Sequence, residues 1–267
     1  MRIRVPSMAL RIIDDLVADG RTCFTFAEAV CRSGRSRTAT ANLLRRMADR
    51  GLIDRVRRGH YAVRQFGVLG TDAAAEDVAL AVGAAFAGRT HRIGYRSALD
   101  EHDLIAHPAR TIQVAAVSRT RATSLSRRPL RVVIEPEKTI AIGARASGAS
   151  RISDLERALL DAAARPALVG GAAVLAEAVA AAGSRADPAR LMRYAQQLSW
   201  TAALRRIGSL VDALEVSGLK SQLEPILPPQ GDIELEPAVT EQTAWRDPLW
   251  RVRWAQTREE LANVAGQ

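Results

Sequence analysis

Apolar residues return at helical spacing in a short segment near the N-terminus. Between residues 36 and 50, Ala39, Leu43, Leu44 and Met47 would share one face of a helix. The opposite face is small or cationic and would fit a DNA groove; it comprises Ser36, Arg37, Thr38, Thr40, Ala41 and Arg45. Gly51 favours the end of this helix. The segment therefore predicts a helix with one buried face and one face suited to DNA.

The residues that follow predict a β-hairpin. Residues 52–57 alternate between apolar and polar positions as in a short strand, Arg58 and Gly59 favour a tight turn, and residues 60–63 would return as the partner strand. A helix followed by a hairpin with arginines at its tip is typical of a winged helix.

Two further helices precede this segment. Residues 8–18 carry an apolar face and end before Gly20. Thr25 and Glu28 have the spacing of a capping box at the start of a second helix, residues 26–32, and Ser36 would cap the third. We therefore predict a winged-helix DNA-binding domain at residues 1–66 and a second domain at residues 67–267.

The second domain mixes the two patterns. We expect an α+β fold in which a mixed α/β domain, with a small sheet and a helical C-terminal part, follows the winged helix. The predicted strands are residues 92–95, 111–117, 130–134 and 139–142. The predicted helices are residues 75–87, 97–102, 154–164, 171–182, 188–198 and 201–216.

The positive charge is concentrated at one end. Residues 1–66 hold 14 arginines against six acidic residues, so they carry eight of the chain's nine net positive charges. Such a localised excess favours contacts with phosphate. Of the 38 basic residues 36 are arginine, which forks onto phosphate and guanine. A GC-rich genome would explain why the chain uses arginine instead of lysine. It would not explain why the excess of positive charge lies in residues 1–66.

Catalytic or metal-binding chemistry has few candidates. Asp100, Glu101, His102 and Asp103 form one acidic cluster, but consecutive residues on a helix point in different directions, so a solvated helix end is favoured over a metal or base site. The sequence has no P-loop, dinucleotide fingerprint or nucleophile elbow, and its two cysteines are too few for a structural zinc site. We therefore expect no enzyme activity, no cofactor and no metal.

No segment predicts a membrane span or a signal peptide. The longest small-apolar stretch, residues 167–183, contains Glu177 and falls short of the roughly 20 residues that a span needs. We expect a soluble, cytoplasmic protein.

Residues 154–164 predict a well-capped core helix. An apolar stripe would face the core while charged residues cover the other faces, and Arg157 could pair with Asp161 four residues on. Asp154 with Arg157 and Asp161 with Arg165 are further possible pairs. We favour this structural interpretation over a partner-binding role for the helix.

The same segment resembles the AbiEi family, the antitoxins of AbiE-type (type IV) toxin–antitoxin pairs. The family pattern D-x-E-R-[TA]-L-[LV]-D…P…G-G is matched by Asp154, Glu156, Arg157, Ala158, Leu159, Leu160, Asp161, Pro166, Gly170 and Gly171. Residues 95–104 resemble the family's S-A-L…H-x-L helix, and residues 111–117 follow where the family has a strand. Residues 58–61 are similar to the R-G-x-Y that closes its winged helix.

This resemblance implies a two-part regulator. The winged helix would bind inverted repeats in the promoter of its own operon and repress it. The second domain would counteract a cognate nucleotidyltransferase-like toxin; the family's type IV description has no stable complex, and direct contact with the toxin stays an open alternative.

The DNA-binding hypothesis assigns a role to each exposed residue. Ser36, Arg37, Thr38, Thr40 and Ala41 would face base edges, with Arg37 as the reader of guanine. Arg35, Arg45 and Arg46 would meet phosphates, and Arg57 and Arg58 would lie in or beside the minor groove.

Two other hypotheses stay open. One is a ligand-responsive winged-helix repressor unrelated to a toxin, and the other is an enzyme, nuclease-like in body, with an appended DNA-binding domain. The tail, residues 227–267, matches no family motif, and its Trp245, Trp250 and Trp254 would form either core or a partner-binding hot spot, of which core burial is favoured.

Overall fold

The chain divides into two compact units. The computed structural model describes residues 7–19, 21, 23–57, 59–63, 78–125, 128–148, 150–216, 219, 223, 231–234 and 243–265. Unit 1 comprises residues 1–89, 120–130 and 147–150, and unit 2 comprises residues 90–119, 131–146 and 151–267. The predicted domain boundary between residues 66 and 67 lies outside the described residues and stays a prediction.

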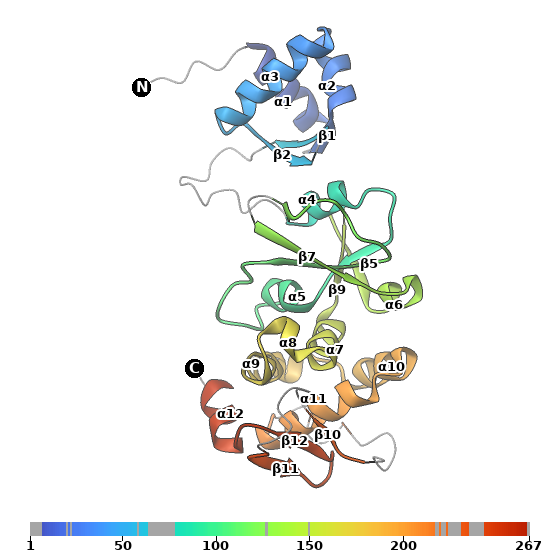
Figure 1. The fold of residues 1–267 in the computed structure, drawn as a ribbon, viewed down its shortest axis with the longest axis vertical. Helices are drawn as coiled ribbons and strands as arrows, with labels where there is room; N and C mark the ends of the chain where they lie inside the picture. The colour runs from blue at the N-terminus through green and yellow to red at the C-terminus, as the bar shows by residue number, and fades with distance from the viewer. Residues whose placement is uncertain are drawn as a thin grey trace. The chain divides into compact units, whose positions relative to one another are not determined.

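Unit 1 contains a winged helix, as predicted (Figure 1). Its elements are α1 (Ser7–Ala18), β1 (Cys23–Thr25), α2 (Phe26–Ser33), α3 (Arg37–Asp49), β2 (Ile53–Arg57), β3 (His60–Val63) and α4 (Val78–Ala85). The strand β1 was not predicted; it pairs antiparallel with β3, which in turn pairs antiparallel with β2. The predicted helix at residues 75–87 corresponds to α4, and its first three residues lie outside the described ranges.

The helix boundaries in unit 1 follow from local capping. The Thr25 side chain accepts a hydrogen bond from the Glu28 N–H (3.2 Å), and the Glu28 carboxylate accepts one from the Thr25 N–H (2.6 Å), so the predicted capping box is confirmed. Burial opposes ionisation of Glu28, but these hydrogen bonds and nearby Arg21 outweigh it and hold its pKa below the usual value. Helix α2 ends at Gly34, whose φ of +61° is left-handed.

One apolar cluster holds α1, α2, α3 and the three strands of unit 1 together. Its buried members are Ala9, Ile12, Ile13, Leu16, Phe24, Ala29, Leu43, Leu44, Met47, Leu52, Ile53 and Val63. Every helix of the winged helix and all three strands contribute to it, so α3 is fixed by the predicted apolar positions 43, 44 and 47.

A second sheet has six strands in the order β6-β7-β5-β4-β9-β8. Its strands are β4 (His91–Ile93), β5 (Ile112–Ala116), β6 (Ser124–Leu125), β7 (Arg128–Ile134), β8 (Ala144–Ser147) and β9 (Ser150–Ser153). The sheet is mixed, because β4 pairs antiparallel with β5 and parallel with β9. The predicted strands at residues 92–95, 111–117 and 130–134 correspond to β4, β5 and β7; β6, β8 and β9 were not predicted.

The remaining elements complete a helical C-terminal part and a third, small sheet. The helices are α5 (Tyr95–Glu101), α6 (Glu137–Ala141), α7 (Leu155–Ala164), α8 (Pro166–Val169), α9 (Ala172–Ala182), α10 (Pro188–Leu198), α11 (Thr201–Ala213) and α12 (Arg258–Ala265), with a 3-10 turn at Gly183–Arg185. The small sheet has the order β10-β12-β11, from β10 (Ile233–Glu234), β11 (Trp245–Asp247) and β12 (Val252–Trp254). Figure 1 shows α7 next to α8 and α11, and α12 beside the small sheet.

One sequence prediction is wrong at the end of β7. Residues 139–142 were expected to form a strand, but residues 137–141 form the short helix α6. Pro136 precedes its first turn. The Arg157 guanidinium donates to the carbonyls of Thr139 (2.7 Å) and Ile142 (2.9 Å) at its other end. A distant cation thus satisfies carbonyls that a helix of this length cannot satisfy itself.

Four fully buried charges meet in unit 2, and we refer to Arg92, Glu135, Arg157 and Asp161 as the ion cluster. Asp161 accepts from Arg157 Nε (2.8 Å) and from the Arg92 guanidinium. Glu135 accepts from Arg157 Nη2 (3.1 Å) and lies 3.4 Å from Arg92 Nη2. Two positive and two negative charges therefore cancel in a site with no more than 3% exposure.

The ionised state of the cluster follows from this pairing. Burial alone would raise the pKa of Asp161, but the charges of Arg92 and Arg157 outweigh it and hold the pKa below its usual range. Burial and the neighbouring carboxylates Asp161 and Glu135 raise the pKa of Tyr95, whose hydroxyl donates to Glu135 (2.5 Å). Tyr95 therefore serves the cluster as a hydrogen-bond donor.

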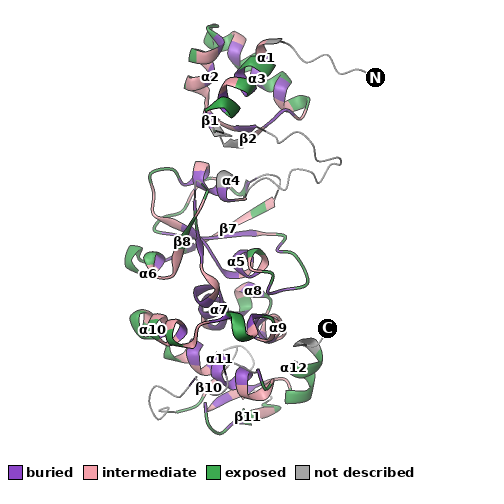
Figure 2. Ribbon diagram, turned by 180° about the vertical axis from the view of Figure 1, so that it is seen from behind, coloured by how far each residue is buried: buried purple, intermediate pink, exposed green. Residues whose placement is uncertain are grey.

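Helix α7 carries two members of the cluster and is buried along most of its length (Figure 2). The predicted Arg157–Asp161 pair is confirmed. The charged residues Glu156, Arg157 and Asp161, which were expected on the faces beside the apolar stripe, are all buried as well. Asp154 caps the helix by accepting from the Arg157 backbone N–H (2.9 Å), and Arg165 lies over the Tyr95 ring instead of pairing with Asp161. The helix is a core element, as favoured.

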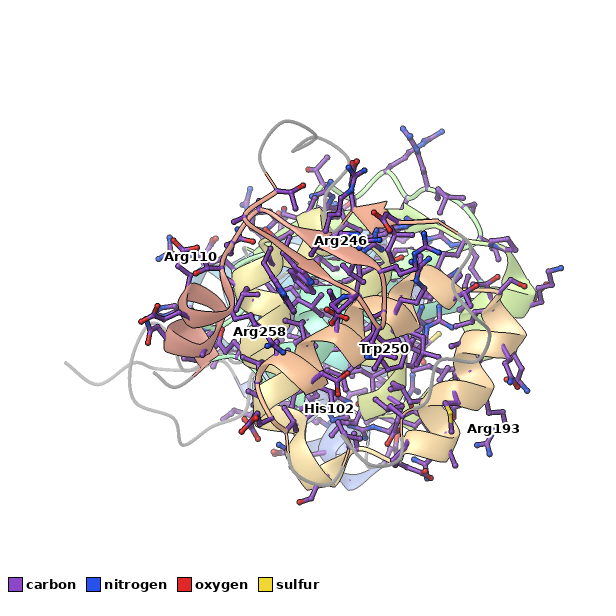
Figure 3. The ribbon with its side chains drawn as sticks, turned by 90° about the horizontal axis from the view of Figure 1, so that it is seen from below. His102, Arg110, Arg193, Arg246, Trp250 and Arg258 are labelled. Carbon is purple, nitrogen blue, oxygen red and sulfur yellow. The ribbon has the colours of Figure 1, made fainter. Side chains whose placement is uncertain are left out.

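The described part of the tail, residues 231–234 and 243–265, includes residues that pack on α11. Trp250 and Trp254 are buried, which confirms the favoured interpretation as core, and half-buried Trp245 stacks on Trp254. In the view of Figure 3, Arg193 lies at the edge of the molecule. The Trp250 ring lies so close to Gly208 that a Cβ there would meet it at 2.3 Å. Only glycine therefore lets this ring pack on α11.

Candidate nucleic-acid interface

The turn between α2 and α3 sets the position of α3. The Ser36 side chain accepts from the Ala39 N–H (3.3 Å) and begins the helix as predicted. The Ser33 and Thr40 hydroxyls lie 2.9 Å apart in a buried hydrogen bond that joins the end of α2 to the first turn of α3. Two helices connected in this way form a helix-turn-helix.

Most of the predicted contact residues lie on the exposed face of α3 and its preceding turn. The exposed members are Arg35, Ser36, Arg37, Thr38, Ala41, Arg45 and Arg46. Their role in binding DNA stays a prediction. A side chain must be exposed to contact DNA, and these side chains are.

Thr40 is the exception. It was placed on the base-reading face, but it is fully buried and its hydroxyl is committed to Ser33. The helical period explains the error, because position 40 precedes Leu43 and Leu44 by three and four residues and so falls on the core face. Thr40 is a structural residue of the turn.

Arg37 is held near the wing. Its guanidinium lies 5.2 Å from the centre of the Phe26 ring, and the Phe26 N–H donates to the carbonyl of Gly59 in the wing turn (2.7 Å). Phe26 thus connects the first residue of α3 with the turn of the hairpin. Arg37 itself is exposed, and a cation–π contact made by an exposed arginine is weak, so Arg37 can turn toward a base at small cost.

The wing is a short irregular hairpin. Arg55 faces Tyr61 and Arg57 faces His60, with a bulge between Arg55 and Arg57. Gly59 has φ +79°, which a tight turn requires. Arg58 and the Arg57 side chain lie outside the described residues, so their predicted minor-groove contacts stay predictions.

Ion pairing separates two groups of arginines in unit 1. Arg21 pairs with Glu28 (2.7 Å) and Arg32 pairs with Asp19 (2.6 Å), so carboxylates neutralise both. Among the described residues, no ion pair joins a carboxylate to the arginines of the α3 side, which are Arg35, Arg37, Arg45, Arg46, Arg50 and Arg55. Unpaired positive charge at a helix that also presents small polar residues is what a nucleic-acid surface requires.

Three exposed residues of this surface were not predicted. Asn42 lies between Ala41 and Arg45 on α3, and asparagine can pair bidentately with adenine. Arg50 ends α3, and Arg55 is the exposed residue in an alternating strand. The helical period of 3.6 residues places Asn42 on the exposed face of α3, and the strand period of two places Arg55 on the exposed face of β2. These patterns could have identified both residues from the sequence.

The acidic cluster of residues 100–103 lies at the end of α5, and two of its side chains make hydrogen bonds to nearby backbone. Asp100 accepts the Ala109 N–H (3.0 Å), the His102 ring bonds the Ser153 carbonyl (2.8 Å), and Glu101 and Asp103 are exposed. Within the described ranges, no group of three or more His, Cys, Asp or Glu residues is placed to hold a metal ion. No described helix has both the length and the apolar character to cross a bilayer.

Comparison with known proteins finds a family match for the N-terminal segment. Residues 11–64 match the model of a family described as "Transcriptional regulator, AbiEi antitoxin". No curated protein matches the chain. Among solved structures, the crystal structure of the RV2827C protein from Mycobacterium tuberculosis is similar, with a TM-score of 0.69, 17% identity and coverage of 100% of this chain and 97% of that chain. At this identity the likeness shows the fold alone.

The family match and the geometry agree on the same residues. The matched segment contains α2, α3 and the wing, and the family is one of transcriptional regulators rather than of enzymes. The winged helix at residues 11–64 is therefore that of the AbiEi antitoxin family of transcriptional regulators.

Proposed function

We propose that the protein is an antitoxin that represses its own toxin–antitoxin operon and counteracts a cognate nucleotidyltransferase-like toxin. The observation that carries the proposal is the unpaired arginine face of α3, in a segment that matches the AbiEi regulators. Such a regulator acts in the cytoplasm, on double-stranded promoter DNA with inverted repeats.

In this proposal α3 enters the major groove. Arg37 reads guanine, with Ser36, Thr38 and Ala41 beside it at the base edges. Arg35, Arg45 and Arg46 contact phosphates and set the register of the helix, while Arg57 and Arg58 reach the minor groove. Thr40 has no direct contact, because it is buried.

The test is binding of the full chain to its own upstream promoter and to scrambled DNA across a salt series. Tight, promoter-selective binding with a steep salt slope is expected. Arg37→Ala should reduce the preference for the promoter over scrambled DNA by roughly 1–3 kcal/mol. Arg46→Ala should weaken binding to both DNAs by the same factor and lower the slope of log affinity against log salt by about 1. Arg21→Ala is the matched control, since Glu28 already neutralises this exposed arginine.

Two outcomes would contradict the proposal. Equal losses on promoter and scrambled DNA for Arg37→Ala would remove its base-reading role. If the unmodified chain binds promoter and scrambled DNA equally well, then unit 1 is only a generic cationic surface.

The antitoxin part needs a separate assay. It is supported by the resemblance of residues 154–171 and 95–104 to the AbiEi pattern. Co-expression with a cognate nucleotidyltransferase-like toxin should restore growth, and the Arg37→Ala variant should still restore it if DNA reading and antitoxicity are separate. A chain that represses its promoter but never restores growth would instead be a repressor unrelated to a toxin.

A further inference from the structure

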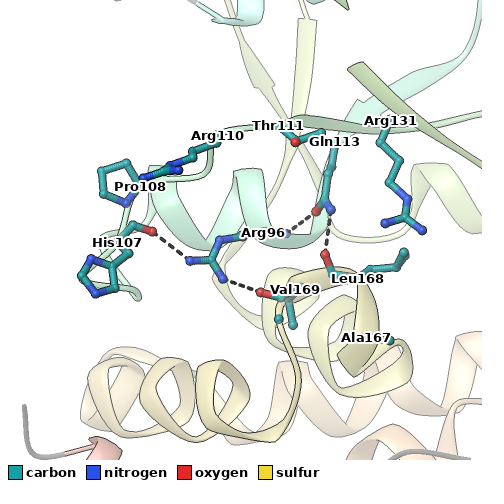
Figure 4. A pocket seen from close by; sticks show the side chains of 11 residues that line it. Arg96, His107, Pro108, Arg110, Thr111, Gln113, Arg131, Ala167, Leu168 and Val169 are labelled. Carbon is teal, nitrogen blue, oxygen red and sulfur yellow. Dashed lines mark hydrogen bonds between the residues drawn. The ribbon is translucent and has the colours of Figure 1, made fainter. Parts of the chain in front are cut away.

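Unit 2 contains a pocket that the regulatory function does not use. It is lined by parts of α5, β5, β7 and α8 and by residues 107–111 (Figure 4). Its volume is about 530 Å³, which lies in the range typical of small-ligand sites. We refer to it as the cationic pocket, because its charged lining residues are Arg96, Arg110 and Arg131.

No carboxylate is among the described residues that line this pocket. The Arg96 guanidinium donates to the carbonyls of Val169 and His107, which are neutral and leave its charge uncompensated. Arg110 and Arg131 are exposed, and their guanidinium groups have no hydrogen bond or ion pair to the described part of the chain. Three positive charges thus share one pocket, and an anion would relieve their repulsion.

Hydrogen bonds hold the residues at the centre of the pocket in place. Gln113 is 3% exposed, and its side chain accepts from the Arg96 N–H (2.7 Å) and donates to the Leu168 carbonyl (2.7 Å). Gly170 has φ +115°, and a Cβ there would lie 3.0 Å from Arg96 Nη1. Arg96 is therefore fixed by groups on both sides of it, which reduces the entropy lost when a ligand binds.

The placement of the arginines favours one chemical class. In Figure 4, Arg110 and Arg131 lie on opposite sides of Arg96. A single carboxylate can meet only one of these positions at a time, and the three carboxylates of citrate branch from one compact centre. A linear chain of phosphates presents several oxyanions in a row to separated guanidinium groups. We propose that the cationic pocket binds the di- or triphosphate group of a small ligand, either free or as part of a nucleotide. The proposal goes beyond the regulatory function and does not depend on it.

Calorimetric titration of the full chain tests this site with pyrophosphate, tripolyphosphate, ATP and citrate. Binding of the phosphate probes is expected, and citrate should bind at least tenfold more weakly. Tighter binding of ATP than of tripolyphosphate would identify a nucleotide, and equal binding would identify the free polyphosphate.

Variants locate the binding. Arg110→Gln and Arg131→Gln should each weaken phosphate binding by roughly tenfold or more, as expected for a lost charge-assisted hydrogen bond. Both residues are exposed and unpaired among the described residues, so both variants should fold. Arg145→Gln is the matched control on β8, and Arg45→Gln controls for the unpaired arginines of unit 1.

Several results would overturn the proposal. They are no heat with any phosphate probe, equal affinity for citrate, or equal losses in the pocket variants and the two controls. Displacement of ATP from the pocket by a short oligonucleotide, with Arg45→Gln unaffected, would assign the pocket to a nucleic acid instead.

Discussion

Asp161→Asn tests whether the ion cluster holds unit 2 together. Asp161 accepts hydrogen bonds from both arginines of the cluster and from the Ser153 hydroxyl (3.0 Å). Asparagine keeps the shape but removes the charge and turns one acceptor into a donor that faces donors. Arg92 and Arg157 would then share Glu135 alone, and the site would carry an uncompensated positive charge.

The structure sets the size of the effect. Removing one partner of a buried ion pair costs about 3–5 kcal/mol, because the other charge stays buried without compensation. All four charges here are 3% exposed or less, so water cannot replace the lost carboxylate. Because whole domains are stable by only about 5–15 kcal/mol, this loss is a large share of the stability of unit 2.

Tryptophan fluorescence during urea unfolding measures this effect in the intact protein. All four tryptophans, at positions 200, 245, 250 and 254, belong to unit 2, so their emission reports on that unit. Asp232→Asn is the control, since Asp232 pairs with Arg246 at the surface (2.9 Å), where ion pairs contribute little.

One result would refute the reasoning about the cluster. If Asp161→Asn shifts the tryptophan transition no more than Asp232→Asn does, with an unchanged slope, then the buried charges contribute no net stability. A broad, non-cooperative transition would instead mean that the cluster specifies unique packing.

Three further predictions concern other contacts. Thr40→Val should cost about 1 kcal/mol by removing the hydrogen bond to Ser33, seen as faster hydrogen exchange of α3 amides; unchanged exchange would contradict it. Gly208→Ala should destabilise unit 2 by about 1–3 kcal/mol despite its better helix propensity, because the methyl group would overlap the Trp250 ring; a red-shifted emission would report it, and an unshifted one would exclude the overlap. Because the pKa of Asp161 is lowered on folding, its contribution is present above the unfolded value of about 4 and is lost as pH falls through the folded pKa, so the urea midpoint should fall on acidification more in the parent than in Asp161→Asn.

Local signals were sufficient for much of unit 1. The capping box of Thr25 and Glu28, the cap at Ser36 and the apolar stripe of α3 each depend on residues within one or two helical turns, and each is present in the structure. The exposed side of α3 follows from the same period, and so does the burial of Thr40, which lies three and four residues before Leu43 and Leu44. Only the hydrogen bond from Thr40 to Ser33 could not be predicted from α3 alone, because Ser33 lies across the turn.

Unit 2 depends more on contacts between distant segments. The helix at residues 137–141 contains β-branched residues and reads as a strand, but Arg157 binds the carbonyls at its end. The burial of Arg157 and Asp161 was equally hidden, because their partners Arg92 and Glu135 come from other strands and loops. The cationic pocket combines residues from positions 96 to 170, so no local pattern indicates it.

During synthesis, the core of the winged helix can form before the ion cluster can. The apolar core of the winged helix uses residues 9–63 only, so all of its members have left the ribosome early in synthesis. The ion cluster must wait for Asp161, which lies 69 residues after Arg92. A chain that ends between Val63 and Asp161 would contain every residue of the winged-helix core but would lack the Asp161 that completes the ion cluster. Such a truncated translation product could still bind DNA.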